Sequence, residues 1–295
     1  MHELVHHTRP NGDPYPMIEC QIFRAFREGK GVHVDDEVMW RADGTSFYAE
    51  YWSYPIDQDG ELIGSVLTFV DISERKKLEM KLRAEHARAE RLLLNVLPAE
   101  IARQLKAKPG GTIAQHFEEV TAVFADIVGF TPLTARMSPE QAVELLNEVF
   151  SAFDRLTEKH GVEKIKTIGD GYMVVAGAPT PIENHCQVMA NLALDMRDWI
   201  NHLQRDDGIK LQVRFGMNSG SAVGAVVGTS KFTYDLWGDA INVASRMEST
   251  GEPGRIQVAE EAWKRLKGSY ALEPRGSIDV KGKGTMETWF LESHI

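Results

Sequence analysis

Two aspartates stand where carboxylates could do chemistry. Asp126 interrupts the apolar run FADIVGFTPL (124–133), and Asp170 lies in the turn IGDG (168–171). Burying a lone carboxylate is costly unless a partner compensates its charge. Two carboxylates that converge at strand ends form a hard-oxygen site suited to Mg²⁺ and substrate phosphates. Each aspartate could instead only shape a turn, which fits Asp170 better than Asp126.

Polar side chains farther along the chain could extend such a site. Asn242 and Arg246 are four residues apart, so a helix would place both on one face, where they could bind a ribose and a phosphate oxygen. Lys281, in the glycine-rich stretch VKGKG (280–284), could reach a polyphosphate. Alone, the Asn-Arg pair is unspecific, and VKGKG could be an ordinary basic hairpin turn. Two Mg²⁺ ions about 4 Å apart would suit phosphoryl displacement at such a site.

Alternating strand-like and helix-like segments from about residue 118 would position these side chains. A strand at 121–130 precedes an amphipathic helix that begins at Ser138-Pro139 and ends at Gly161. A hairpin around residues 169–171, a helix from about 183 to 203 and a strand over 211–228 follow. This order predicts an α+β fold with a ferredoxin-like βαββαβ core. Two more helices and final strands complete the expected domain.

Four motifs, in this order and at this spacing, resemble the class III nucleotidyl cyclase catalytic domain. They are FADIVGFT, EKIKTIGDGYMVVAG, YDLWGDAINVASRMESTG and VKGKG. The resemblance covers about residues 118–294, so we assign 118–295 to a catalytic domain. It implies a dimer in which each active site lies between two catalytic domains.

The resemblance implies a metal and phosphate site. Asp126 and Asp170 match the two metal-binding aspartates, with the backbone near Ile127 in the same shell, and we expect two Mg²⁺ ions per site that Mn²⁺ could replace. Lys281 matches the lysine that contacts the outer phosphates. Backbone groups that would cradle phosphate oxygens lie at Gly129, Phe130 and Thr131.

The resemblance also implies how the nucleotide is recognised. Lys166 and Asp235 match the pair that recognises adenine, while Asn242 and Arg246 match the residues that orient the ribose and stabilise the transition state. Adenine presents an acceptor at N1 and a donor at N6, which suits a lysine and a carboxylate. Guanylyl members of the family typically carry Glu and a Cys or Ser there, and a reversed donor-acceptor pair is strongly rejected. We therefore expect ATP as the substrate.

The expected reaction converts ATP to 3′,5′-cyclic AMP and pyrophosphate. By resemblance, one subunit contributes Asp126 and Asp170 and the other contributes the remaining side chains, so one complete chain predicts a homodimer. The alternatives are a guanylyl or relaxed-specificity cyclase and a catalytically weak regulatory module. A diguanylate cyclase also has a ferredoxin-like core with paired carboxylates, but its GG[DE]EF signature is absent.

The N-terminal quarter, residues 1–74, resembles the C-terminal half of a PAS sensor domain. Two Asp-Gly turns separate β-rich runs and predict an antiparallel meander, ending in DISERKKLE. The first strands and short helices of a PAS domain have no counterpart here, so we expect no PAS cofactor. Residues 75–98 carry a weak heptad seam that predicts a coiled-coil helix joining two subunits, or else a solvated connector. Residues 99–117 are assigned to a linker.

Composition limits the other classes of function. The formal charge of −10 disfavours nucleic-acid binding. No apolar run is long enough for membrane insertion, and no secretory leader is recognisable. The two cysteines, Cys20 and Cys186, lack zinc-ligand spacing and are expected to be reduced thiols in a cytoplasmic protein.

Overall fold

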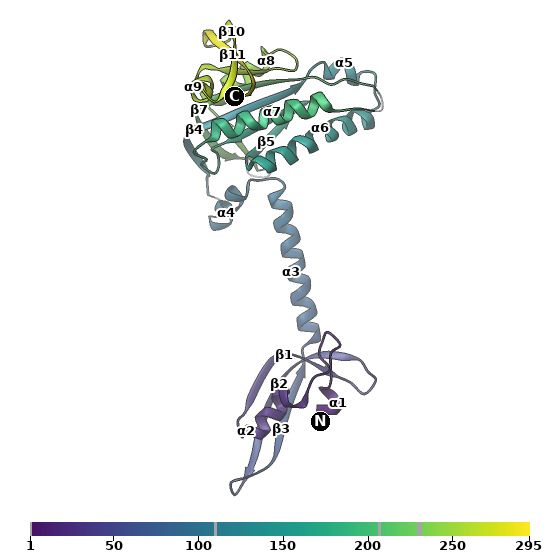
Figure 1. Ribbon diagram of the computed structural model, residues 1–295. Coiled ribbons are helices and arrows are strands. Elements are labelled where there is room, and N and C mark those ends of the chain that lie inside the picture. Colours follow the sequence, from purple (N-terminus) through teal and green to yellow (C-terminus); the bar gives the residue numbers. More distant parts are fainter. Residues whose placement is uncertain (1, 109–110, 206–207, 229–231) are drawn as a thin grey trace. The chain divides into compact units, whose positions relative to one another are not determined.

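The computed structural model describes residues 2–108, 111–205, 208–228 and 232–295 (Figure 1). Contacts divide the chain into two compact units, Met1–Leu92 and Leu93–Ile295. No helix in the described ranges is both long enough and apolar enough to cross a membrane.

The N-terminal unit is built on an antiparallel meander, as the two Asp-Gly turns predicted. Its strands pair in the order β1-β2-β3, and the buried Met39, Ala49 and Tyr51 form its core with Cys20 and Ile22. Short helices precede the strands. The elements of this unit are α1 (His2–Val5), η1 (Met17–Glu19), α2 (Gln21–Glu28), β1 (Val32–Trp40), β2 (Ser46–Gln58) and β3 (Glu61–Asp71).

The C-terminal unit is an α+β domain around one mixed sheet, as predicted. Its strands follow the order β10-β11-β9-β7-β4-β6-β5, and β8 pairs with β7. The segment β4-α6-β5-β6-α7-β7 is the expected βαββαβ core. Its strands and helices are β4 (Ala114–Ile127), α5 (Phe130–Thr134), α6 (Pro139–His160), β5 (Glu163–Ile168), β6 (Gly171–Ala176), α7 (His185–His202), β7 (Val213–Val227), β8 (Thr233–Trp237), α8 (Asp239–Ser249), β9 (Ile256–Ala259), α9 (Glu260–Leu266), β10 (Tyr270–Val280) and β11 (Gly284–His294).

Local signals set the ends of the core helix α6. Ser138 accepts a hydrogen bond from the backbone of Gln141, whose side chain accepts one from the Ser138 backbone, and Pro139 occupies the first turn. Gly161 ends the helix in the left-handed conformation, at φ 65°. This capping box with a glycine C-cap is an N- and C-terminal signature that the sequence alone carries.

Two apolar layers hold the sheet. Helices α6 and α7 pack side by side on one face, where Phe153 and Met196 contact the sheet (Figure 1). Helix α8 covers the other face, together with α4 (Ala99–Ala107). Ile101 of α4 is 1% exposed in that second layer, so part of the range assigned to a linker is packed in the catalytic unit's core.

Helix α3 (Ser73–Leu94) connects the two units in the sequence and has no buried residue. Leu78, Leu82, Leu92 and Val96, which belong to the predicted heptad seam, are all exposed. The helix occupies most of the range 75–98, where helix-favouring residues predicted it.

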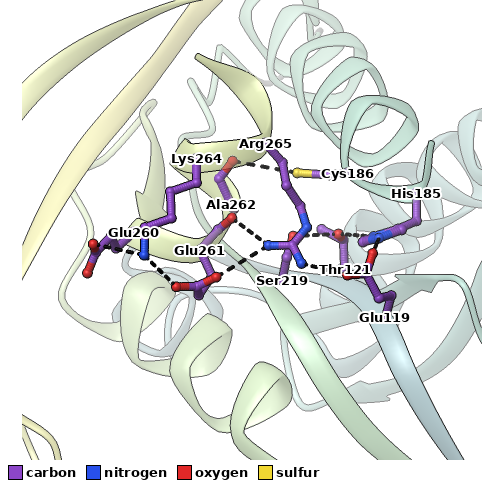
Figure 2. Close-up of polar contacts among 10 residues, drawn as sticks. All are labelled: Glu119, Thr121, His185, Cys186, Ser219, Glu260, Glu261, Ala262, Lys264 and Arg265. Carbon is purple, nitrogen blue, oxygen red and sulfur yellow. Dashed lines mark hydrogen bonds and ion pairs between the residues drawn. The ribbon is translucent and has the colours of Figure 1, made fainter. Parts of the chain in front are cut away.

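A hydrogen-bonded network ties α7 and α9 to the middle of strands β4 and β7 (Figure 2). Thr121 Oγ1 lies 2.6 Å from His185 Nδ1 and 2.7 Å from Ser219 Oγ. His185 Nε2 lies 3.2 Å from Glu119 Oε2, and Arg265 Nη2 donates to Glu119 Oε1 at 3.0 Å. Since the buried Thr121, His185 and Ser219 have partners, burying them carries little penalty.

Candidate active site

Strand β4 directs Asp126 toward the face of the sheet that α8 covers. Side chains alternate between faces along a strand, and Ala125 and Ile127 lie in the apolar layer under α6 and α7. Phe124 belongs to the opposite layer, and Asp126 follows it by two residues. Alternation alone thus puts the carboxylate on the α8 side, near the strand's end.

The β5–β6 hairpin brings Asp170 to the same place. Gly171 is the register partner of Asp126, and a Cβ at Gly171 would lie 3.8 Å from Asp126 Oδ1. Gly169, at φ 62°, allows the tight turn before Asp170. Burial raises the pKa of Asp170, and the Asp126 charge raises it further. The two predicted metal aspartates are therefore neighbours.

Two charged side chains that the sequence analysis missed complete this cluster. Arg214 of β7, opposite Asp126 in register, donates to Asp126 Oδ2 at 2.8 Å. The same Nη2 lies 3.2 Å from Glu248 Oε1 of α8. Arg214 could have been found from the sequence, because it interrupts an apolar strand as Asp126 does. No sequence pattern pointed to Glu248.

Gly216 explains how α8 comes close enough for this contact. It lies two residues after Arg214 and therefore faces α8. A Cβ at this position would sit 1.9 Å from the backbone nitrogen of Glu248 and 2.4 Å from the Ala244 carbonyl oxygen. No larger residue fits without moving the helix.

The cluster carries more negative than positive charge. Asp126, Asp170 and Glu248 face one guanidinium, that of Arg214. Burial raises the pKa of Glu248 to about 7, and the Asp126 charge adds to this, while Arg214 only partly opposes it. Converging carboxylates short of positive charge are a donor set for a hard divalent cation.

The predicted adenine pair is also assembled. Lys166 Nζ of β5 donates to Asp235 Oδ2 of β8 at 2.5 Å. The second carboxylate oxygen accepts from the Leu236 backbone at 2.9 Å. The Asp235 side chain is 16% exposed and that of Lys166 32%, so both can still meet a ligand.

The three remaining side chains line one pocket. Asn242 and Arg246 are exposed on α8, and Lys281 lies in the β10–β11 turn beside them. The pocket has a volume of about 370 Å³ and also includes Lys283, which forms an ion pair with Asp239. Side chains 35 to 39 residues apart in sequence thus meet on one surface.

The predicted backbone cradle follows β4 directly. Ile127 is buried and pairs with Val213. Gly129 is left-handed, at φ 70°, and caps the short helix α5, which contains Phe130 and Thr131. The chain therefore turns sharply beside Asp126.

Two groups of predicted residues stay apart within one chain. Among described side chains, no hydrogen bond or ion pair joins the cluster at Asp126 to the Lys166–Asp235 pair or to the pocket at Asn242 and Arg246.

Comparisons with known proteins agree with this architecture. A family model of the adenylate and guanylate cyclase catalytic domain matches residues 112–293. An adenylate cyclase of Mycobacterium tuberculosis is 47% identical over 220 residues, covering 75% of this chain and 50% of that protein. Guanylate cyclase soluble subunit beta-2 of Rattus norvegicus is 42% identical over 229 residues, covering 75% and 33%. The chain thus spans half or less of the length of these relatives.

A solved structure shares the fold. The guanylate cyclase domain of RhGC from Catenaria anguillulae, in complex with GTP, superposes with a TM-score of 0.60 at 34% identity, covering 61% of this chain and all of that one. The family model covers well over half of the chain and contains every predicted site residue. The chain therefore belongs to the class III adenylate and guanylate cyclase catalytic domain family.

Proposed function

We propose that this chain is an adenylate cyclase that converts ATP to 3′,5′-cyclic AMP and pyrophosphate. The observation that carries the choice of ATP is the contact between Lys166 Nζ and Asp235 Oδ2. A lysine can only donate and an ionised carboxylate can only accept, which matches N1 and the 6-amino group of adenine. Guanine presents the opposite pattern and would leave both groups unpaired.

The carboxylates Asp126 and Asp170 fit a magnesium or manganese site. Their oxygen donors suit both ions, and burial, together with the Asp126 charge, raises the pKa of Asp170. When bound, two such ions would supply Lewis acidity to the nucleotide's reacting oxygens. Ile127 would contribute its backbone, as the family resemblance implies.

The other residues bind and orient the nucleotide. Asn242 would hold the ribose, and Arg246 on the same helix face would stabilise negative charge developing around the α-phosphoryl group. Lys281 would bind the outer phosphates, and the backbone at Gly129, Phe130 and Thr131 would receive phosphate oxygens. No side chain is assigned as a general base, so solvent or a phosphate oxygen takes the 3′-hydroxyl proton.

Each site would be completed by a second copy of the chain. In support, the carboxylate cluster and the adenine pair form separate groups within one chain. Mixing inactive Asp170→Ala with inactive Asn242→Ala protein should restore activity, because half of randomly mixed dimers carry one intact site, roughly a quarter of all sites. Mixed dimers that form but stay inactive would contradict a shared site.

The direct test is a cyclase assay of the purified chain with ATP or GTP and either Mg²⁺ or Mn²⁺. We expect cyclic AMP from ATP, with a kcat/KM ratio over GTP of at least about 100. The pair Lys166→Glu with Asp235→Cys should shift that ratio toward GTP. Absence of cyclic AMP with both metals would refute the proposal. It would favour the alternative, a catalytically weak regulatory module.

A relaxed-specificity or guanylyl cyclase is the second candidate. Guanylate cyclase relatives at 42% identity support keeping it. Equal rates with ATP and GTP in the same assay would favour it over the first.

We also propose that α3 pairs with its copy as a coiled coil and transmits a signal from the PAS-like unit. The exposed Leu78, Leu82 and Leu92 support this, because one helix alone leaves them in water. Inserting one residue near Ala87 would rotate the downstream helix by about 100°. Unchanged cyclase activity in a folded insertion variant would argue against coupling.

A further inference from the structure

A second cluster of ligand-type side chains lies in the N-terminal unit, which the cyclase reaction does not use. One ring nitrogen of His2, one of His6 and the Cys20 sulfur all lie within 4.8 Å of one another. The side chains come from α1, the residues just after it, and the residue before α2. His6 is 0% exposed and Cys20 1%.

The outer nitrogen of each imidazole already has a neighbour. His2 Nε2 lies 2.8 Å from the Tyr15 carbonyl oxygen, which can only accept, so this nitrogen carries the hydrogen. His6 Nε2 forms an ion pair with Glu37 Oε1 at 3.0 Å, although without hydrogen-bond geometry, and Glu37 accepts a hydrogen bond from the Tyr51 hydroxyl. Metal-binding histidines are typically oriented in this way, by a carbonyl or a carboxylate on the nitrogen that does not bind metal.

The other nitrogen of each ring is available. His2 Nδ1 is buried and has no hydrogen-bond partner. A neutral imidazole with its hydrogen on Nε2 has a lone pair on Nδ1, and leaving that lone pair buried without a partner is costly. His6 Nδ1 lies 3.1 Å from Cys20 Sγ. His2 Nδ1 is thus an acceptor that a cation would satisfy, and a cation could take the place of the hydrogen between His6 Nδ1 and Cys20 Sγ.

We propose that His2, His6 and Cys20 bind one Zn²⁺ ion. Two imidazoles and a thiolate are a donor set for a borderline-soft cation and a poor one for Mg²⁺ or Ca²⁺. In a tetrahedral zinc site with ordinary bond lengths, neighbouring ligand atoms are roughly 3.4–3.7 Å apart. The observed spacing needs only small side-chain adjustments to reach this.

A pocket lies beside two of the three side chains. A cavity of about 190 Å³ is lined by His2 and Cys20 together with Met17 and Phe23. Three protein ligands with an open fourth position leave room for a water or a small anion.

Zinc would take the place of the hydrogen between His6 Nδ1 and Cys20 Sγ, which lie 3.1 Å apart, while Glu37 stays beside the ring. Because zinc binds the thiolate form of cysteine, metal binding should release a proton.

Cobalt titration of the untagged full chain tests this. Co²⁺ reports a thiolate ligand through a sulfur-to-metal charge-transfer band in the near ultraviolet. We expect one Co²⁺ per chain with this band, displaced stoichiometrically by Zn²⁺. Cobalt at the acidic cluster of Asp126 and Asp170 would bind through oxygen and give no such band, and an Asp126→Asn background should retain it.

Variants identify the ligands. Cys20→Ser should abolish the band, whereas Cys186→Ser, which removes the other free and buried cysteine, should leave it intact. His2→Gln, at a partly exposed position, should weaken cobalt binding more than about 100-fold without threatening the fold, and Glu37→Gln about 10- to 100-fold.

Absence of the band in the wild-type chain, or a band that survives both Cys20→Ser and His2→Gln, would overturn the proposal. The cluster would then be only a hydrogen-bonded cysteine, histidine and glutamate. Neither result depends on cyclase activity.

Discussion

The middle and the C-terminal end of strand β4 carry polar side chains in opposite arrangements. In the middle, Glu119 and Thr121 join His185, Ser219 and Arg265 in a network of paired donors and acceptors (Figure 2). At the C-terminal end, three carboxylates face one arginine.

The direction of the pKa shifts expresses the same contrast. The hydrogen bond from His185, with Arg265, lowers the pKa of Glu119. Burial and the Asp126 charge raise the pKa values of Glu248 and Asp170. A satisfied network stabilises the fold, whereas a cluster lacking positive charge is prepared for a cation. Substitutions in the network and in the carboxylate cluster should therefore separate stability from activity.

The largest expected effect comes from Asp126→Asn. Removing this carboxylate should lower kcat/KM for ATP by about 10³-fold or more, because it takes away a cation ligand. Thermal stability should stay level or rise, since repulsion with Asp170 and Glu248 falls. Glu119→Gln, in the middle of the same strand, is the matched control and should keep activity within about threefold. Activity of Asp126→Asn within tenfold of wild type would remove the basis of the comparison.

Thr121→Val should have the opposite effects: it should lower stability and leave activity nearly unchanged. It keeps the side-chain shape but leaves His185 and Ser219 without their shared partner, a loss of about 1–3 kcal/mol in unfolding free energy. Cyclase activity at a permissive temperature should change less than about threefold. Denaturant titration measures the unfolding free energy, with Thr285→Val, at an exposed position of β11, as control. An equally large loss of unfolding free energy in Thr285→Val would show that the network contributes little.

The smallest expected effect is on the pH dependence of stability, which should have opposite signs for Glu248 and Glu119. Because the folded-state pKa of Glu248, about 7, lies above its usual 4.5, its contribution to stability is present below pH 4.5 and lost as pH rises toward 7. Metal-free wild type should therefore lose about 1–2 kcal/mol relative to Glu248→Gln over this interval.

Glu119 should behave the other way. Its lowered pKa means that its stabilisation is present at neutral pH and is lost as pH falls through the folded-state pKa. Melting temperatures in EDTA for wild type, Glu248→Gln and Glu119→Gln, from neutral pH to well below pH 4.5, provide the measurement. Parallel pH profiles for all three proteins would contradict the assignment.

Much of the site could be predicted because its signals are local. Ser138, Pro139 and Gly161 mark the ends of α6, and a glycine turn marks the hairpin that carries Asp170. The four-residue spacing of Asn242 and Arg246 places both on one face of α8. Caps, turns and helix periodicity depend on neighbours within a few residues, so they can be predicted from the amino-acid sequence.

Other features depend on contacts between distant segments. Glu248 reaches Arg214 because β4 and β7 pair in one register and Gly216 admits α8 to the sheet. The spacing of His2, His6 and Cys20 matches no expected zinc pattern, so their cluster also became apparent only in the folded unit.

The sequence by itself determined the family, the fold class and the types of residue available for chemistry. Tertiary structure decided which of them meet. Asp126 indicated that some partner must exist, since its charge interrupts an apolar strand. Strand register and helix packing decided that Arg214 supplies only part of that compensation and that Asp170 and Glu248 increase the need for more.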